Sequence, residues 1–435
     1  MTGIGGWRQR IASRNPLPTG ASTVGVWIGF TGLTAYGFLA LGARSLGEGA
    51  QYSALSALWA LGFVVGPGFF MPVEQEVARA LAHRRAQGHG GLPVVRKAAS
   101  LAFGLATALT LVTVASGPVL AEELFAGSWW LVFALVLFLY GYALEHLVRG
   151  ALGGNQRFHS YGLLLASEGT FRLVGAAVLA AIGVTVAGPF GVIVGVGPFL
   201  GSALAASRER GTLGPGPDAP WSELTQALVY LVIGAVLGQA LMNAVPIAAQ
   251  ALAGPDESAV AGTLLNGLLV ARVPLFFFQA IQASLVPELS GHRGAGRHAE
   301  LVRGVRRILS VVVVIGVSAT IGAALLGPWA VRTFFGSEFR LGSLDMALLA
   351  GASGLLMLAL AFVQVLIALS RYRRVAELWI VGAVAFIVGL VIDVGDLSRR
   401  VEIAFLIGSA AAALCALAFV LRELDRESQA RSGNT

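Results

Sequence analysis

The stretch 129–148 reads WWLVFALVLFLYGYALEHLV, twenty residues among which only Glu145 carries a formal charge. A helix of about 20 apolar residues is long enough to cross the hydrocarbon core of a bilayer. A surface helix of a soluble protein would instead carry polar residues along one whole face. The stretch is therefore predicted to span a membrane.

The rest of the chain has the same character. Of its 435 residues, 56% are hydrophobic and 12% are charged, and the mean hydropathy is +0.77. A typical soluble protein has roughly a quarter of its residues charged. The 57 glycines suit a bundle of membrane helices, in which small residues let the backbones approach closely. The composition excludes a soluble globular fold and predicts an all-α polytopic membrane protein.

About 12 transmembrane helices are predicted from the apolar runs. Because so many spans use most of the chain, only short loops and tails remain, without room for a soluble domain. The runs are 22–43, 52–72, 98–120, 129–148, 161–182, 184–206, 224–252, 259–289, 302–326, 341–369, 375–394 and 403–421.

The basic residues predict the orientation of the chain. If the N-terminus lies in the cytoplasm, 23 of the 30 Lys and Arg residues fall in cytoplasmic segments and 5 in outer loops. Cytoplasmic loops of membrane proteins carry an excess of Lys and Arg. We therefore expect both termini on the cytoplasmic side of the cytoplasmic membrane. Topology accounts for the net charge of +7, so no nucleic-acid partner is expected.

The two halves of the sequence resemble each other at an offset of 209 residues. Six spans per half place both halves in the membrane in the same direction, which predicts a parallel repeat about an axis along the membrane normal. We expect an N-terminal lobe over residues 1–206, a Gly- and Pro-rich cytoplasmic linker over 207–222 and a C-terminal lobe over 223–435. The matching pairs include His83 and His292, Arg84 and Arg293, and Lys97 and Arg306.

Two arginines lie near the middle of predicted spans. A central arginine costs about 2.5 to 3.5 kcal/mol on insertion scales, so each needs a partner or a water-filled cavity. Glu168 lies four residues before Arg172 on the same helix face and predicts an ion pair. Arg272 has no acid near it in its own helix, which predicts an anion-binding residue that faces a cavity.

Other polar residues within the spans are candidates for contact with substrate. Gln239 and Asn243 share one helix face, and Gln279 follows Arg272 by seven residues. Thr34, the repeat counterpart of Asn243, belongs to an aromatic and hydroxyl stripe that suits contact with a sugar. Polar side chains at these spacings can equally join neighbouring helices, and both readings stay open.

Motifs for catalysis or cofactor binding are absent from the sequence. It has no nucleotide-binding glycine loop with lysine and no HExxH zinc motif, and its single cysteine, Cys415, lies in an apolar run. Glu145 and His146 are expected to anchor their helix at the membrane interface, and the basic stretch at 74–87 is expected to be a solvated loop or a surface helix. The sequence predicts a transporter without cofactor or metal rather than an enzyme.

The segment 271–290 reads ARVPLFFFQAIQASLVPELS, with Arg272, Pro274, Pro287, Leu289 and Ser290. Together with two parallel six-helix lobes, it resembles the multidrug/oligosaccharidyl-lipid/polysaccharide exporter superfamily, and most of all its polysaccharide flippase branch. The resemblance implies movement of a polyprenyl-pyrophosphate-linked oligosaccharide from the cytoplasmic to the outer leaflet. It also implies membrane lipids and polysaccharide-assembly enzymes as partners.

The chain departs from one part of that superfamily. The related lipid II flippases have fourteen helices and an arginine in the first, whereas twelve are predicted here and the first contains none. This departure favours a surface glycan other than the peptidoglycan precursor. Two alternatives remain: a cation-coupled multidrug antiporter of the same superfamily, and a membrane scaffold for glycan assembly that transports nothing.

Overall fold

The computed structural model describes residues 21–209, 213–221, 224, 228–275, 278, 298–369, 371–392 and 394–432. Within these ranges the chain forms helices and no strand. The first half contains α2 (Ala21–Leu46), α3 (Ala50–Ala86), α4 (Leu92–Ala115), the short α5 (Gly117–Val119) and η1 (Leu120–Leu124), α6 (Trp129–Gly154), α7 (Phe158–Ala181) and α8 (Ala187–Arg208). The second half contains α10 (Leu228–Met242), α11 (Ala244–Leu252), η2 (Pro255–Glu257), α12 (Val260–Ala271), α14 (His298–Phe335), α15 (Ser343–Ala368), α16 (Tyr372–Gly389) and α17 (Leu397–Ser432).

The described helices confirm an all-α polytopic membrane protein. Nine of them are long and apolar enough to cross a membrane, or ten if α10 and α11 form one span bent by 62°. The two remaining predicted runs coincide with α12, which is described as far as Ala271, and with α16. Helix α16 has 18 residues, and its first two turns contain three charged ones, Arg373, Arg374 and Glu377.

The helices pack in the same pattern in the two halves. In the first half α2 contacts α7, α3 and α4 contact α6, and α8 contacts both α6 and α7. About 209 residues later, α10 contacts α16, α12 and α14 contact α15, and α17 contacts both α15 and α16. The internal repeat suggested by the sequence is therefore also a repeat of helix packing.

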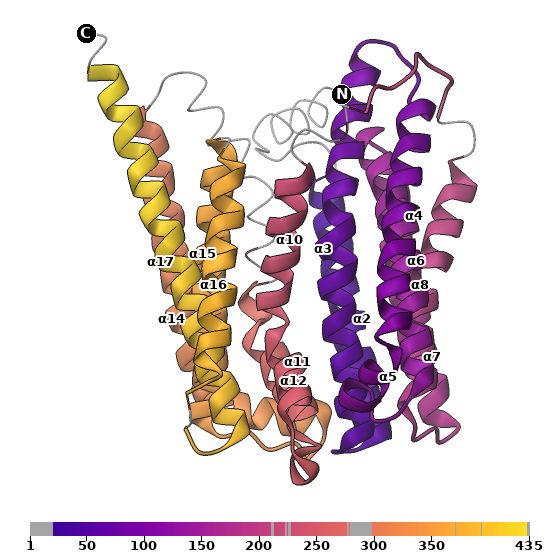
Figure 1. The fold of residues 1–435 in the computed structure, drawn as a ribbon, viewed down its shortest axis with the longest axis vertical. Coiled ribbons are helices and arrows are strands. Elements are labelled where there is room, and N and C mark those ends of the chain that lie inside the picture. The colour runs from indigo at the N-terminus through magenta and orange to yellow at the C-terminus, as the bar shows by residue number, and fades with distance from the viewer. Residues whose placement is uncertain are drawn as a thin grey trace, which may run out of the picture.

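The helices of the first half form one group, α2 to α8, and those of the second half form another, α10 to α17. Figure 1 shows the two groups side by side, with α10, α11 and α12 next to the first group. Helix α3 makes most of the contact between the groups, because it packs against α10, α11 and α12. Helix α2 begins and α17 ends at the same end of the bundle, the upper end in Figure 1. We call this the terminal end and the other the opposite end.

Glycines allow close packing of α3 against α6. The rings of Phe138 and Tyr142 stack with their centroids 4.2 Å apart. A Cβ atom at Gly62 would lie 2.8 Å from Phe138, and one at Gly66 would lie 2.8 Å from Tyr142. Any larger residue at either position would push the helices apart, as expected where small residues mediate helix contacts in a membrane.

The first two spans of the second half are interrupted where their counterparts in the first half are continuous. Pro246 has no N–H to donate to the carbonyl of Met242, so α10 ends and α11 starts beyond Asn243 at an angle of 62°. Pro274 likewise cannot donate to the carbonyl of Val270, and α12 ends at Ala271, with Arg272 as its C-cap.

Candidate functional site

A buried guanidinium group, that of Arg272, directly follows α12. The Nε and Nη2 atoms of Arg272 are buried, and no described residue forms a hydrogen bond with them. Its electrostatic neighbour is Tyr36 of α2, whose hydroxyl donates to the carbonyl of Leu269 at 2.5 Å. Arg272 therefore lies where the two groups of helices meet, with donors available for an anion.

Asn243 and Gln239 lie at the break between α10 and α11. The side-chain amide of Asn243 donates to the carbonyl of Gln239 at 2.9 Å, and its backbone N–H donates to the same carbonyl at 3.0 Å. Asn243 is buried, and Gln239 is half-buried. In this conformation the Asn243 side chain completes the end of α10. Gln279, the remaining candidate of the second half, lies outside the described residues.

The ion pair predicted in the fifth span is present. Arg172 Nη1 lies 3.0 Å from Glu168 Oε1, and both side chains are at most 4% exposed. The guanidinium also lies over the ring of Trp59 in α3, 5.3 Å from its centroid. The pair therefore joins α7 to α3 inside the first group.

Thr34 is part of the contact between α2 and α7. Its hydroxyl donates to the carbonyl of Thr31 at 2.9 Å. A Cβ atom at Gly169 of α7 would lie 2.4 Å from the Thr34 hydroxyl oxygen, so the two helices touch there. The contacts of Thr34, Glu168 and Arg172 thus lie within the first group, whereas Asn243 and Arg272 lie at the ends of α10 and α12.

A second polar cluster was missed in the sequence. His146 Nδ1 lies 2.6 Å from Glu74 Oε2, and the Tyr161 hydroxyl donates to Glu74 Oε1 at 2.9 Å. Arg149 lies 3.2 Å from both Glu74 and Glu145. The cluster joins α3, α6 and α7 near the terminal end.

The expectation that Glu145 and His146 anchor the membrane interface was wrong, since they are only 1% and 2% exposed. The reason is that α3 continues to Ala86, well beyond the predicted end of its span at residue 72, and covers this part of α6. In the sequence, this polar cluster is indicated by Glu145 and Arg149, which lie four residues apart within an apolar run.

Hydrogen bonds between the two groups gather at the opposite end. Tyr52 donates to Asn266 Oδ1 at 2.5 Å, and the Gly262 N–H donates to Ser53 Oγ at 3.1 Å. Two further bonds join the same ends: Thr263 donates to Glu48 at 3.1 Å, and Arg44 donates to the Thr333 carbonyl at 2.7 Å. The two groups are closed against each other at this end.

The described part of the predicted linker, residues 207–222, packs on the first group at the terminal end. Arg84 donates to the carbonyls of Pro217 at 2.7 Å and of Asp218 at 3.0 Å. Lys97 lies 5.7 Å from the ring centroid of Trp221. Arg84 is 4% exposed, so the stretch at 74–87 is the end of α3 with a buried arginine and not a solvated loop.

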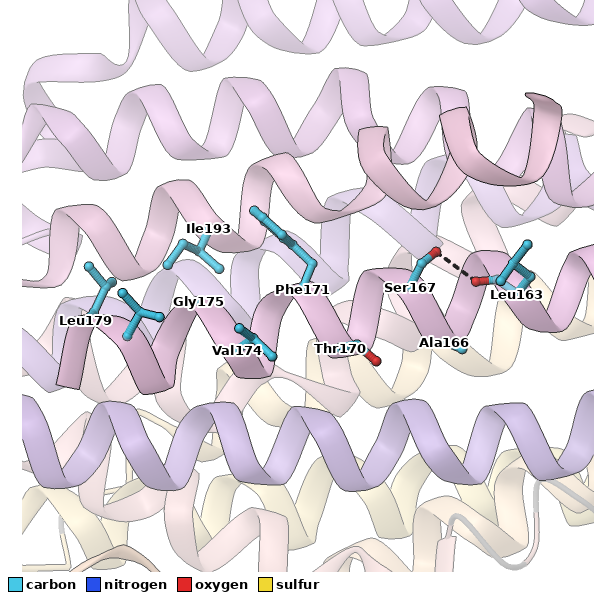
Figure 2. Close-up of a pocket in the computed structure, with 10 residues that line it drawn as sticks. Leu163, Ala166, Ser167, Thr170, Phe171, Val174, Gly175, Leu179 and Ile193 are labelled. Atoms are coloured by element: carbon cyan, nitrogen blue, oxygen red, sulfur yellow. Dashed lines mark hydrogen bonds between the residues drawn. The ribbon is translucent and has the colours of Figure 1, made fainter. Parts of the chain in front are cut away.

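A shallow groove runs along α7 on the outside of the first group, as Figure 2 shows. Its volume is about 790 Å³. Most of its lining residues are apolar, and the hydroxyl of Ser167 donates to the carbonyl of Leu163 at 2.7 Å. The groove therefore suits hydrocarbon chains. Its lining residues are Leu163, Ala166, Ser167, Thr170, Phe171, Val174, Gly175, Val178, Leu179 and Ile193.

Comparison with solved structures shows the fold class. The chain is similar to a multidrug resistance MATE family transporter of the MOP superfamily in an inward-facing conformation, with a TM-score of 0.72 and 12% identity over 91% of this chain and 96% of that one. It is also similar to a MOP superfamily transporter from Pyrococcus furiosus, with a TM-score of 0.63 and 13% identity over 94% and 96% of the two chains. The chain therefore has the fold of MOP superfamily transporters.

Sequence relatives occur in mycobacteria. One uncharacterized protein of Mycobacterium tuberculosis is 26% identical over 419 residues, which are 94% of this chain and 92% of the relative. Another is 26% identical over 354 residues, 79% of this chain and 78% of the relative. No protein-family model matches the chain.

Proposed function

We propose that this protein is a flippase that moves a polyprenyl-pyrophosphate-linked oligosaccharide across the cytoplasmic membrane, from the cytoplasmic to the outer leaflet. The two groups of helices act as lobes that open alternately to the two sides. The fold supports a transporter, because the solved proteins that share it are transporters.

The observation that carries the choice of substrate is Arg272. Two of its guanidinium nitrogens are buried between the lobes, without a hydrogen-bond partner in the part of the chain that the structure describes. A buried donor without an acceptor is costly, and an anionic ligand would satisfy it. A guanidinium binds two phosphate oxygens in a fixed geometry, which suits a pyrophosphate group.

The broken helices support the same proposal. Binding sites of membrane transporters are often formed by discontinuous helices at the interface between repeats. Here both α10–α11 and α12 are interrupted in the half of the chain that carries Arg272.

The conformation fits loading from the cytoplasm. With the terminal end on the cytoplasmic side, as the positive-inside distribution predicts, the hydrogen bonds between the lobes close the outer end. This agrees with the inward-facing conformation of the MATE family transporter that the chain resembles. Substrate would enter from the cytoplasmic leaflet, and the outer end would open to release it.

A multidrug antiporter is the second candidate, because that transporter is described as conferring multidrug resistance. An organic cation would need acidic side chains between the lobes. Among the described residues, Glu48 joins the lobes, but it lies at the opposite end and accepts a hydrogen bond from Thr263. The Pyrococcus furiosus protein is described as having a binding pocket of reverse polarity that suggests a different function, so the fold itself accommodates other substrate charges.

The experiment compares ligand binding by purified wild type, Arg272→Ala and Arg208→Ala. Arg208 is an exposed arginine at the terminal end and serves as the matched control. A polyprenyl pyrophosphate at a hundredfold excess over Kd should stabilise the wild type and the control by about 2.7 kcal/mol. Stabilisation should disappear in Arg272→Ala, while the unliganded variant remains folded because an unpaired buried charge has been removed.

Stabilisation by a lipophilic cation and not by the pyrophosphate would overturn the proposal in favour of the multidrug antiporter. Stabilisation by neither ligand would favour the non-transporting scaffold. A flipping assay in proteoliposomes then tests transport itself, with Arg272→Lys as a variant that keeps the charge and loses the bidentate geometry.

A further inference from the structure

Two carboxyl groups lie close together at the opposite end of the second lobe. Glu402, in the second turn of α17, is fully buried, and neither of its carboxylate oxygens has a hydrogen-bond partner among the described residues. Asp345, in the first turn of α15, faces the same guanidinium as Glu402, that of Arg399. The Asp345 side chain is 20% exposed, so it connects the buried carboxyl with the outside.

One guanidinium faces both carboxyl groups. Arg399 Nη2 lies 2.8 Å from Asp345 Oδ1, whereas Arg399 Nη1 lies 3.9 Å from Glu402 Oε2, too far for a hydrogen bond. Asp396, which accepts the backbone N–H of Arg399 at 2.8 Å, is the other charged group that acts on Glu402. A single arginine cannot balance two ionised carboxylates, so the pair lacks one positive charge.

A bound proton supplies the positive charge that the two carboxylates lack. Two ionised carboxylates are acceptors only, and a proton on one of them turns it into a donor to the other. Bound there, the proton satisfies one orphaned Glu402 oxygen and neutralises the excess charge. A metal ion fits less well, because the described residues contain no group of three or more His, Cys, Asp or Glu side chains that could hold one.

The internal repeat shows that the fold does not need charges at these positions. The residues 209 positions before Asp345, Arg399 and Glu402 are Val136, Phe190 and Ile193, all apolar. The first lobe thus forms the same contact between its helices, α6 and α8, without any ion pair there. The charged group in the second lobe is an addition to the scaffold.

We propose that Asp345 and Glu402 form a proton-binding site that is reached from the opposite end of the bundle through Asp345. A hydronium ion at the opposite end gives up a proton, so that one of its O–H bonds breaks and water is left. The proton forms a new O–H bond with one of the carboxylates, which then donates a hydrogen bond to the other. Helix α17 packs against α11 and α12, so binding of the proton shifts the position of the two broken helices. This last step rests on the transport function proposed above, whereas the site itself does not.

Infrared spectroscopy of the purified protein tests the site directly, since a protonated carboxyl has its own absorption band. We expect that band in the wild type at neutral pH and its loss in Glu402→Gln. The matched control is Glu423→Gln. Glu423 is also buried in α17, but it is paired with Arg371 at 2.8 Å and Arg426 at 3.0 Å, so its substitution should leave the band unchanged.

A second variant, Asp345→Asn, tests the same site in case Glu402→Gln does not fold. In Asp345→Asn, Arg399 can balance the one remaining carboxylate, so the band should again disappear. A wild type without the band, or a band that persists in both Glu402→Gln and Asp345→Asn, would overturn the proton site.

The conformational step is tested without substrate. Spin labels on α17 and α11 should report a distance that changes with pH in the wild type and stays constant in Glu402→Gln. A wild-type distance that is independent of pH would overturn this step alone. Because neither measurement needs a transported molecule, their failure is distinct from a failure of the proposed function.

Discussion

The backbone N–H of Gly262 donates a hydrogen bond to the hydroxyl of Ser53, at 3.1 Å, across the contact between the two lobes. The two residues are 209 positions apart, which is the offset of the internal repeat. Positions related by a two-fold axis can touch each other only near that axis. The pseudo-symmetry axis therefore passes close to Ser53 and Gly262, at the opposite end of the bundle.

Tyr52→Phe should weaken the closure at that end. The substitution removes the hydrogen bond to Asn266 at 2.5 Å and leaves the ring in place beside Phe339, with 5.3 Å between the centroids. Loss of one such bond costs about 0.5 to 1.5 kcal/mol, a two- to tenfold shift in population. Distances between spin labels on α2 and α14 should show a larger open fraction, and an unchanged distribution would contradict the role of this bond.

Gly262→Ala should have a stronger effect in the same direction. Its Cβ atom would lie 2.6 Å from the ring of Tyr52, so either the ring or the lobes must move. We expect a lower melting temperature and a more open opposite end. Gly29→Ala is the matched control because nothing lies within 4 Å of a Cβ atom there, and its melting temperature should not fall.

Glu168→Gln should destabilise the first lobe strongly. Removal of one partner from a buried ion pair typically costs about 3 to 5 kcal/mol because the other charge is left unpaired. Arg172 would keep only its contact with Trp59. The double variant Glu168→Gln, Arg172→Met should recover much of the loss, and unfolding in denaturant measures all three proteins. Additive losses would show that the pair is not coupled.

Glu74→Gln should loosen the contact between α3 and α6. The substitution removes the charge that faces both His146 and Arg149. Hydrogen bonds to charged groups contribute about 1.5 to 3 kcal/mol each, so we expect a loss of this order in the free energy of unfolding. The exposed Glu123, substituted in the same way, is the control and should change little.

Pro246→Ala should reduce transport and leave folding intact. Alanine restores an N–H that can donate to the carbonyl of Met242, which favours a continuous helix across Asn243. The free energy of unfolding should stay equal or rise, while the flipping rate in proteoliposomes falls. Full activity with a straightened helix would show that the break is not needed for transport.

The sequence by itself determined the class of the protein and its helices. Long apolar runs leave few options in a membrane, because only a helix satisfies every backbone group within one segment. For that reason each predicted run overlaps a described helix, although α3, α14 and α17 extend beyond their runs and the run 224–252 is broken at Asn243. The Glu168–Arg172 pair was also accessible, because four residues on one helix fix the distance between two side chains.

Only the tertiary structure decided which polar residues meet. Glu74 and His146 are 72 positions apart, and nothing local in the sequence indicates that α3 extends far enough to cover α6. Thr34 and Asn243 are equivalent in the repeat, yet one lies against α7 and the other completes a broken helix. Such differences arise from contacts between distant segments, whereas hydropathy reports on one segment at a time.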